Sequence, residues 1–453
     1  MCDLSDQNTA EISEVDFKGG FQRWNRCAPR TRAAASNRNS CMLPCGAYVM
    51  NCAPAILCIR ETAPMELREM IWSYCKVAYI ILFTSLHIVF FGQKTALSFD
   101  PCDALASSCD SCSLLGIQAA QKQCTIIDSA TRFVGFTDLI EDDKHFHIAY
   151  RIANGHNSFD GNIKITSLDK AMRPTQNTTI LHPDDLRDPK FIWRAHGNIS
   201  PSLFATGRKQ TPAGLQWQSY EFELLDGFWS DGRFATPPGH FLWGFADNDE
   251  KQFGISYSVG QLAKRYGRFL SLFERTNDGD YISIAPNFYS AQPDSSTPSE
   301  VAFQFSNDRR LISIIRREWK ENGQSTDWKP RNSVVGVASP PYSVEDWTFY
   351  DIPPHIGGPA MLAIEKTGNS EFLVAGRRKT QWPPRSALMA LYETGNRERP
   401  YNVCTLFSGP PSNDTGYPGL ILGRDGYYYM SDYVSNRGMY YIVVRKFEIL
   451  ECE

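Results

Sequence analysis

The second part of the chain is built from short apolar runs that alternate with polar turns. From Thr131 onward helical periodicity is scarce, and apolar runs of strand length are separated by turns rich in Asp, Asn and Gly. Aligning the chain on itself shows one unit used six times: a small or polar residue, an apolar strand, a turn, and a second apolar strand that ends in Arg or Tyr. The units span residues 136–151, 187–208, 240–257, 299–317, 357–377 and 416–433.

The spacing of these units predicts the fold. Successive units start 51, 53, 59, 58 and 59 residues apart. A period of this size, with a hairpin opening each unit and further strands behind it, is typical of a four-stranded propeller blade. A β-sandwich would show regular short strands without the longer period. We therefore expect an all-β, six-bladed β-propeller over residues 131–450, because six blades close a ring and leave no exposed sheet edge.

A Cys-rich lead-in segment, residues 98–130, precedes the repeats. Cys102, Cys109, Cys112 and Cys124 lie in it, and Cys404 and Cys452 lie in the last two units. In a propeller the N-terminal strand usually closes the ring against the last blade, so we expect Cys404, Cys452 or both to pair with this cluster. The Cys109–Cys112 spacing also occurs in redox and zinc motifs, but no βαβ pattern or second pair accompanies it, which favours a structural disulfide.

An apolar run at residues 77–92 indicates export from the cytosol. Read from Met70, the chain has a basic flank at Lys76, the apolar core, and then small and polar residues, which is the order of a signal peptide over 70–97. In that interpretation residues 1–69 are an extension absent from the mature protein. The alternatives are an uncleaved signal-anchor, which would give the protein its only membrane contact, and a buried core helix.

The bulk composition agrees with an extracellular glycoprotein. The net charge of −4 with mixed signs argues against nucleic acid or an anionic membrane as the partner. An even number of cysteines beyond the apolar run fits an oxidising compartment. Glycosylation sequons lie at Asn177, Asn198 and Asn413. We expect a secreted protein, or a membrane-anchored one if residues 77–92 are retained.

Each unit also places polar residues on one rim of the predicted ring. The first strand starts at one face of the propeller and its hairpin partner returns there, so the residue before the first strand lies beside the one that ends the second. Those positions read Asp138 with Arg151, Arg187 and Asp188 with Arg208, His240 with Tyr257, Glu300 with Arg316 or Arg317, Pro359 with Arg377, and Tyr417 with Asp432 or Tyr433. Several arginines that converge are costly without an anion, and a guanidinium fork matches a carboxylate, so the rim predicts an acidic sugar.

The order of these motifs resembles the sialidase superfamily of BNR-repeat proteins. The resemblance covers residues 131–447 and rests on FTDLIEDDKHFHIAYR, SFDGNIKITSLD, LRDPKF, SEVAFQFSNDRRLISIIRRE, GGPAML with AGR, and DTGYPGLILGRDGYYYMSDYVS. It implies a six-bladed sialidase propeller that hydrolyses a terminal glycosidic bond to an acidic sugar. In such enzymes three arginines hold the substrate carboxylate, a Tyr assisted by a Glu attacks the anomeric carbon, and an Asp is the acid/base.

The resemblance assigns expected roles to residues of this chain. Tyr417 would be the nucleophile, with Tyr433 as the alternative, and Glu300 would activate it. Asp138 or Asp188 would be the acid/base, with Asp160 as a third choice. Arg151, Arg317 and Arg377 would clamp the carboxylate, with Arg187 as a substitute and Arg316 beside Arg317. His240 would line the rim on the third unit.

The sequence also departs from the family. The Arg-Ile-Pro motif of sialidases is replaced by Phe136-Thr137-Asp138-Leu139, which puts sialic acid as the substrate in doubt. Asp-boxes are degenerate and survive only as echoes at residues 167–169, 276–279 and 343–347, where they would stabilise turns. Two other functions stay open: a glycan-binding propeller without catalysis, and a lyase or different glycosidase on the same scaffold.

No cofactor or metal site is expected. His145 and His147 alternate along one strand and so share a face, which favours a packing or solvent-facing pair over metal ligands.

Overall fold

The structure is a computed structural model. It describes residues 99–103, 105–106, 115, 117–193, 201–225, 227–248, 251–292, 296–320, 328–364, 371–379 and 383–451. The segments 1–69 and 70–97, with the expected signal peptide or signal-anchor, therefore lie outside the described residues, as do Cys109, Cys112, Asn198 and Cys452. No helix within the described residues is long and apolar enough to cross a bilayer.

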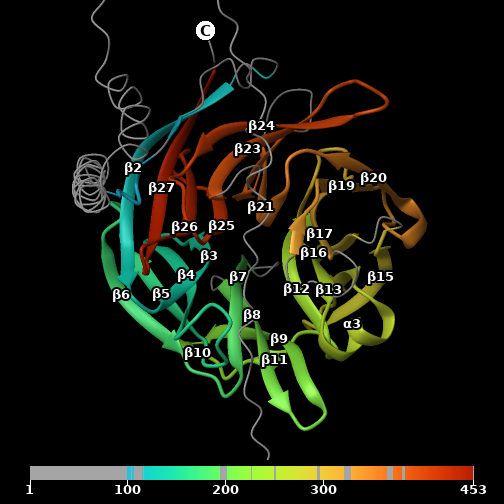
Figure 1. Ribbon diagram of the computed structural model, residues 1–453, viewed down its shortest axis with the longest axis horizontal. Coiled ribbons are helices and arrows are strands. Elements are labelled where there is room, and N and C mark those ends of the chain that lie inside the picture. The colour runs from blue at the N-terminus through green and yellow to red at the C-terminus, as the bar shows by residue number, and fades with distance from the viewer. Residues whose placement is uncertain are drawn as a thin grey trace, which may run out of the picture. The chain divides into compact units, whose positions relative to one another are not determined.

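The described residues form six antiparallel sheets of four or five strands, arranged around a central axis (Figure 1). The first three blades follow the chain order from the inside outward. Blade one contains β3 (Phe133–Glu141), β4 (Phe146–Ala153), β5 (Asn162–Leu168) and β6 (Pro174–Ile180). Blade two contains β7 (Asp185–Trp193), β8 (Pro201–Thr211), β9 (Gly214–Leu225), β10 (Phe228–Trp229) and β11 (Arg233–Phe234). Blade three contains β12 (His240–Asn248), β13 (Lys251–Ser258), β14 (Phe269–Arg275) and β15 (Tyr281–Ser290), with the short helix α3 (Gly260–Tyr266) between its second and third strands.

The remaining blades follow the same order, and two of them also take a strand from the lead-in segment. Blade four contains β16 (Ser296–Phe305), β17 (Leu311–Lys320), β18 (Trp328–Pro330), β19 (Ser333–Ala338) and β20 (Trp347–Ile352), with the 3-10 turn η4 (Val344–Asp346). Blade five contains β21 (Ile356–Ile364), β22 (Glu371–Arg378), β23 (Arg385–Glu393) and β24 (Tyr401–Ser408), to which β1 (Leu105–Ala106) adds. Blade six contains β25 (Thr415–Leu422), β26 (Tyr428–Asn436), β27 (Met439–Glu451) and β2 (Ile117–Ala130).

The ring closes through the lead-in segment. Strand β2 pairs with β27 from Ile117 opposite Glu451 to Ala130 opposite Tyr440, so the last blade takes its outermost strand from the start of the fold. A disulfide joins Cys102 to Cys124 inside the lead-in segment. Cys404 is also disulfide-bonded. Its pairing with Cys109 or Cys112 stays a prediction, because those cysteines lie outside the described residues.

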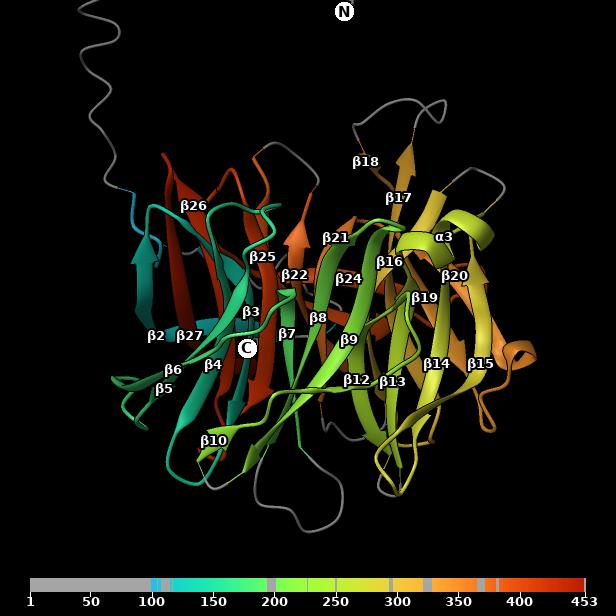
Figure 2. The same cartoon turned by 90° about the horizontal axis from the view of Figure 1, so that it is seen from below.

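The six repeats found in the sequence are the six inner hairpins, which confirms the all-β, six-bladed propeller. The inner strands β3, β7, β12, β16, β21 and β25 each contact the next around the axis, and Figure 2 shows the blades from the side. Large apolar side chains such as Phe133, Phe204 and Phe222 are fully buried between neighbouring sheets. Burial of a side chain of this size contributes roughly 2–3 kcal/mol, so packing between blades is the main source of stability.

The eroded Asp-boxes stabilise turns between the third and fourth strands, as expected. Asp169 accepts hydrogen bonds from the backbone N–H groups of Ala171 and Arg173 at 3.0 and 2.9 Å. Ser343 and Asp346 form a reciprocal capping box ahead of β20. These turns keep the fold without the full motif.

Candidate active site

A β-bulge interrupts every innermost strand at the same level of the ring. The pairing with the second strand skips residues after Gly135, Arg187, Leu242, Pro298, Gly357 and Gly416, once in each blade. A bulge turns an extra side chain out of the regular alternation. Here it directs that side chain toward the axis, so six bulges define one central site.

The bulges contribute two carboxylates, a phenol and two large aromatic rings. They present Phe136, Asp188, Trp243, Glu300 and Tyr417. Three of these residues have a left-handed backbone, with φ of 58° at Phe136, 49° at Asp188 and 56° at Tyr417. A left-handed conformation costs a non-glycine residue roughly 1–2 kcal/mol, and such outliers cluster at functional sites.

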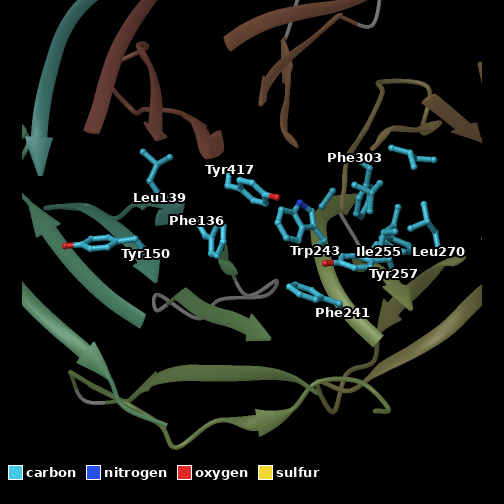
Figure 3. Close-up of a cluster of buried hydrophobic side chains, with 14 of the residues drawn as sticks. Phe136, Leu139, Tyr150, Phe241, Trp243, Ile255, Tyr257, Leu270, Phe303 and Tyr417 are labelled. Carbon is cyan, nitrogen blue, oxygen red and sulfur yellow. The ribbon is translucent and has the colours of Figure 1, made fainter. Parts of the chain in front are cut away.

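The aromatic rings pack together around Tyr417. The ring of Tyr417 lies 4.9 Å from that of Phe136 and 5.5 Å from that of Trp243, centroid to centroid. Figure 3 shows the hydroxyl of Tyr417 directed toward Trp243, with Phe136 alongside. These apolar neighbours hold the phenol in one orientation and keep water away from its ring.

Tyr417 and Glu300 form the central pair. The Tyr417 hydroxyl donates a hydrogen bond to Glu300 Oε1 at 2.8 Å, and the backbone N–H of Gly358 donates to Glu300 Oε2 at 2.7 Å. Burial and then the charge of Glu300 raise the pKa of Tyr417 well above its ordinary value. Burial alone would raise the pKa of Glu300 too, but Arg316 outweighs it and lowers that pKa to about 2. The pair is therefore a neutral phenol bonded to an ionised carboxylate.

Two arginines donate to the same phenolic oxygen. Arg316 Nη1 lies 3.0 Å and Arg377 Nη2 lies 3.2 Å from the Tyr417 oxygen. Donors placed there stabilise negative charge that develops on the oxygen when it loses its proton. An adjacent base plus charge-stabilising donors is the arrangement of an activated nucleophile.

Carboxylates already neutralise both arginines. Arg316 forms ion pairs with Glu300 and Glu318, and Arg377 Nη1 lies 3.5 Å from Asp414 Oδ1. Asp414 in turn accepts a hydrogen bond from the Tyr433 hydroxyl at 2.8 Å. The cluster has no excess positive charge, unlike a site built to bind a carboxylate.

Asp188 lies near this cluster from blade two. It is 6% exposed, its Oδ1 has no hydrogen-bond partner among the described residues, and its Oδ2 lies 3.7 Å from Arg187 Nε. Burial is the main cause that raises its pKa to about 6, Arg187 opposes the rise, and the charge of Glu300 adds to it. Environments that push two carboxyl pKa values apart, here Glu300 and Asp188, create one base and one acid.

Several buried polar atoms of this region lack a partner among the described residues. They are Arg187 Nε, Asp188 Oδ1, Trp243 Nε1, Arg316 Nε and Arg377 Nε. Buried polar groups are nearly always hydrogen-bonded, so a group of exceptions at one place indicates a site for a polar ligand or water. Arg187 also lies over the Phe136 ring at 5.1 Å.

The structure does not bring all three expected clamp arginines to the cluster. Arg151 is fully buried, and protein acceptors occupy its five N–H groups: the carbonyls of Gly155, His156, Ser158 and Leu186, and the carboxylate of Asp185. Arg317 donates to the Asn332 carbonyl at 3.0 Å and pairs with Asp351 at 2.8 Å. Arg316 and Arg377 are the two that reach Tyr417.

Other expected site residues have different surroundings. Asp138 lies one step beyond the bulge and lines a cavity of about 530 Å³ along the inner strands, with Lys190 Nζ 4.0 Å from its Oδ1. His240 bonds Ser256 at 3.0 Å and packs on Phe273 within blade three. Asp160 is exposed and caps the backbone of Asn154.

Sequence reasoning missed four residues of the site: Trp243, Glu318, His355 and Asp414. Trp243 and Asp414 sit beside rim positions that were recognised, and the homologous bulges would have found Trp243. Glu318 follows Arg317 by one residue and shares a strand face with Arg316. Nothing in the sequence singles out His355, a buried imidazole on which the charges of Arg316 and Arg377 act.

One Asp/His cluster among the described residues has the separation of a metal site. Ligand atoms of Asp142, His145 and His147 lie within 4.8 Å of one another. Both ring nitrogens of His147 are engaged, however, with Ser167 at 2.9 Å and Asp142 at 2.8 Å. The sequon residues Asn177 and Asn413 are exposed, as glycosylation requires. Glycosylation at these two positions stays a prediction.

Comparisons with known proteins agree with the architecture. No family model and no curated protein matches the sequence. A protein of unknown function from Dyadobacter fermentans matches with 12% identity and a TM-score of 0.56, over 74% of this chain and 100% of its own. An α-L-arabinanase from Penicillium chrysogenum matches with 11% identity and a TM-score of 0.51, over 72% and 98%. A sialidase from Trypanosoma rangeli matches with 9% identity and a TM-score of 0.37, over 73% and 59%. The matches to the Dyadobacter and Penicillium structures agree with the six-bladed propeller fold seen here, and the structural neighbours include glycoside hydrolases.

Proposed function

We propose that the protein is an extracellular glycoside hydrolase that removes a terminal sugar from a glycan. Tyr417 is the nucleophile, Glu300 accepts its proton, and Asp188 is the acid/base that protonates the departing oxygen. The observation that carries the proposal is the 2.8 Å hydrogen bond from Tyr417 to Glu300, with Arg316 and Arg377 donating to the same phenolic oxygen.

The charges of the site favour a neutral sugar at the reacting position. An acidic sugar needs unpaired guanidinium groups, but Arg151 has no free N–H, and Arg316 and Arg377 are balanced by Glu300, Glu318 and Asp414. This proposal therefore does not include the expected clamp of three arginines for a substrate carboxylate. The Penicillium protein of the same fold acts on arabinan, a neutral glycan, by its name.

In the proposed reaction the phenol attacks the anomeric carbon as its proton passes to Glu300. The glycosidic bond breaks, and Asp188 supplies a proton to the departing oxygen. Water then attacks the sugar–tyrosine bond, Asp188 takes the proton of that water, and the phenol recovers its own from Glu300. Because Asp188 must be protonated for the first step, activity requires a pH near or below its pKa of about 6.

A second candidate, a glycan-binding propeller without catalysis, has one observation in its favour. Tyr417 is only 7% exposed, and a carboxylate whose pKa is about 2 is a weak base. A binder needs the aromatic rings and polar donors but no proton transfer.

The test is hydrolysis of fluorogenic glycosides by the full chain. The panel pairs neutral sugars (arabinofuranoside, galactoside) with acidic ones (sialoside, glucuronide), and we expect turnover of a neutral member. Glu300→Gln and Tyr417→Phe each lower kcat by about 10²–10⁴-fold, the range typical of a lost proton-transfer or nucleophilic group. Asp138→Asn, at a half-buried aspartate outside the cluster, is the matched control.

The outcomes separate the candidates. Turnover that survives both Glu300→Gln and Tyr417→Phe removes the assigned pair. Sugar binding with no turnover of any glycoside by the wild-type protein favours the binding propeller. Preferential turnover of the sialoside would restore the acidic substrate.

A further inference from the structure

A separate cavity opens between blades four and five, beside the candidate active site. Its volume is about 420 Å³. It is lined by residues 353–355 ahead of β21, by Arg378 and Lys379 at the end of β22, by Arg331 and Asn332 between β18 and β19, and by Asn402 and Val403 of β24. Its charged lining residues are Arg331, Arg378 and Lys379, and none of the described residues that line it is acidic. We call it the blade-four/five pocket.

His355 connects this pocket to the active site. The side chain is 6% exposed, and its Nδ1 has no hydrogen-bond partner among the described residues. Burial, and then the charges of Arg316 and Arg377, lower the pKa of His355 to about 3, so the imidazole is neutral. A neutral imidazole that lines a cavity with an unpaired nitrogen offers one more hydrogen bond to a ligand.

The backbone at Gly357 shows how close the two sites are. A Cβ atom at Gly357 would lie 3.5 Å from Arg377 Nε, 3.5 Å from His355 Cε1 and 3.6 Å from Arg316 Nε. The Nε atoms of Arg316 and Arg377 and the ring of His355 therefore surround the same point. Arg316 and Arg377 also donate to the phenolic oxygen of Tyr417, so His355 links the lining of the pocket to the arginines of the active site.

No acidic side chain lines the pocket beside Arg378 and Lys379. Arg378 Nε is buried without a partner, and neither Arg378 nor Lys379 forms an ion pair with a described residue. Burial, and then the charges of Arg377 and Arg316, lower the pKa of Lys379, and the charge of Glu318 opposes this only in part. Arg378 and Lys379 are half-buried, and partly desolvated cations without a counter-charge favour the binding of an anion.

We propose that the blade-four/five pocket binds an oxyanion, a sulfate or carboxylate group carried by the sugar next to the one that reacts. This inference rests on the proposed function for the identity of the carrier, but not for the anion site itself. A guanidinium, an ammonium and an imidazole around one cavity match the several oxygens of such a group. The protein would then combine a neutral reacting sugar with an anionic neighbour in the chain.

The first experiment measures inorganic sulfate binding to the full chain by calorimetry, with chloride at equal ionic strength as the reference. Arg378→Gln and Lys379→Gln each weaken sulfate binding about tenfold, and the double variant abolishes it. Lys209→Gln, an exposed lysine on blade two, leaves it unchanged and is the matched control. Unchanged sulfate affinity in the double variant, or equal binding of chloride, overturns the proposal.

The second experiment separates the pocket from the catalytic assignment. A sulfated oligosaccharide is compared with its desulfated form for displacement of inorganic sulfate, using wild-type and Glu300→Gln protein. We expect only the sulfated form to compete, equally well in both proteins. Sulfate binding that depends on Lys379, in a protein without hydrolase activity, would refute the proposed function but support the anion site. Failure of the sulfated oligosaccharide to compete would refute the proposal that a glycan carries the anion.

Discussion

Blades one and five place an arginine at the same position and use it differently. Arg151 pairs with Gly135 and Arg377 pairs with Gly357, in each case the last pair before the bulge of the inner strand. Arg151 is sealed by Asp185, which β7 of the next blade brings under it, and by four carbonyl groups. Arg377 pairs more loosely with Asp414, whose Oδ1 lies 3.5 Å from its Nη1, and its Nη2 donates to the Tyr417 hydroxyl. The identical register therefore gives both arginines the same backbone position. The partners that the neighbouring blade supplies determine whether the guanidinium group is structural or contacts the site.

The two arginines of blades one and two share a single counter-ion. Asp185 is fully buried and bonds both Arg151 and Arg208. In blade four the order is inverted, because Arg316 alone meets two carboxylates, Glu300 and Glu318. In the first arrangement the protein's own acceptors occupy the guanidinium donors. In the second, Arg316 keeps the Glu300 carboxylate ionised beside the Tyr417 phenol.

The largest expected effect is on stability. Arg151→Met leaves Asp185 buried with one cation fewer and four carbonyl groups without a donor, and we expect the free energy of unfolding to fall by about 3–5 kcal/mol. Arg377→Met leaves Asp414 with His156 and Tyr433 and should cost about 1–2 kcal/mol. Urea denaturation of both variants measures the difference, and equal losses would break the comparison.

The second effect is on catalysis. Arg377→Met removes one donor from the phenolic oxygen of Tyr417, and we expect kcat to fall by about 10²-fold with KM nearly unchanged, as for a lost oxyanion donor. Steady-state kinetics on the glycoside that the wild-type protein cleaves is the measurement. A rise in KM with unchanged kcat would instead assign Arg377 to substrate binding.

The third effect concerns pH. Asp188 holds its proton up to a pH of about 6 in the folded protein, against an ordinary value of 3.8, so activity should fall as pH rises through about 6. The raised pKa of Asp188 stabilises the folded protein below about pH 4, and this stabilisation is lost as the pH rises through 6. Asp188→Asn should remove both the upper limb of the activity profile and this part of the pH dependence of unfolding. Burial also raises the pKa of Asp138 to about 6, and Asp138→Asn should change only the stability of the protein. An unaltered pH profile of activity in Asp188→Asn would mean that another residue is the acid.

The smallest effect sharpens the comparison within blade four. Arg317 has the register position of Arg151 and Arg377, opposite Pro298, but its partner Asp351 is 64% exposed. Ion pairs with exposed partners contribute little, so Arg317→Gln should cost about 1 kcal/mol or less and leave turnover unchanged. Thermal unfolding and the glycoside assay check this; a loss of turnover would return Arg317 to the active site in place of Arg316.

The sequence by itself determined the number of blades and the register of their inner hairpins. Apolar runs at a period of 51–59 residues can bury their faces only against copies of themselves, and the residues that open each run, such as Tyr417 and Glu300, had to meet at the axis. The ring-closing strand also followed from the lead-in segment, because an unpaired edge of the last blade needs a partner.

Only the tertiary structure decided which rim residues form the site. Arg151, Arg317 and Arg377 are equivalent in sequence and in register, yet only Arg377 contacts Tyr417, since Asp185 and Asp351 arrive from other strands. The same holds for two aspartates of the inner strands. Asp188 is the first bulge residue of blade two and lies near the catalytic pair, whereas Asp138 lies two positions further along in blade one and lines a cavity. The repeat determines the backbone position of each side chain. The charged groups and hydrogen-bond partners of neighbouring strands and blades determine which contacts that side chain makes.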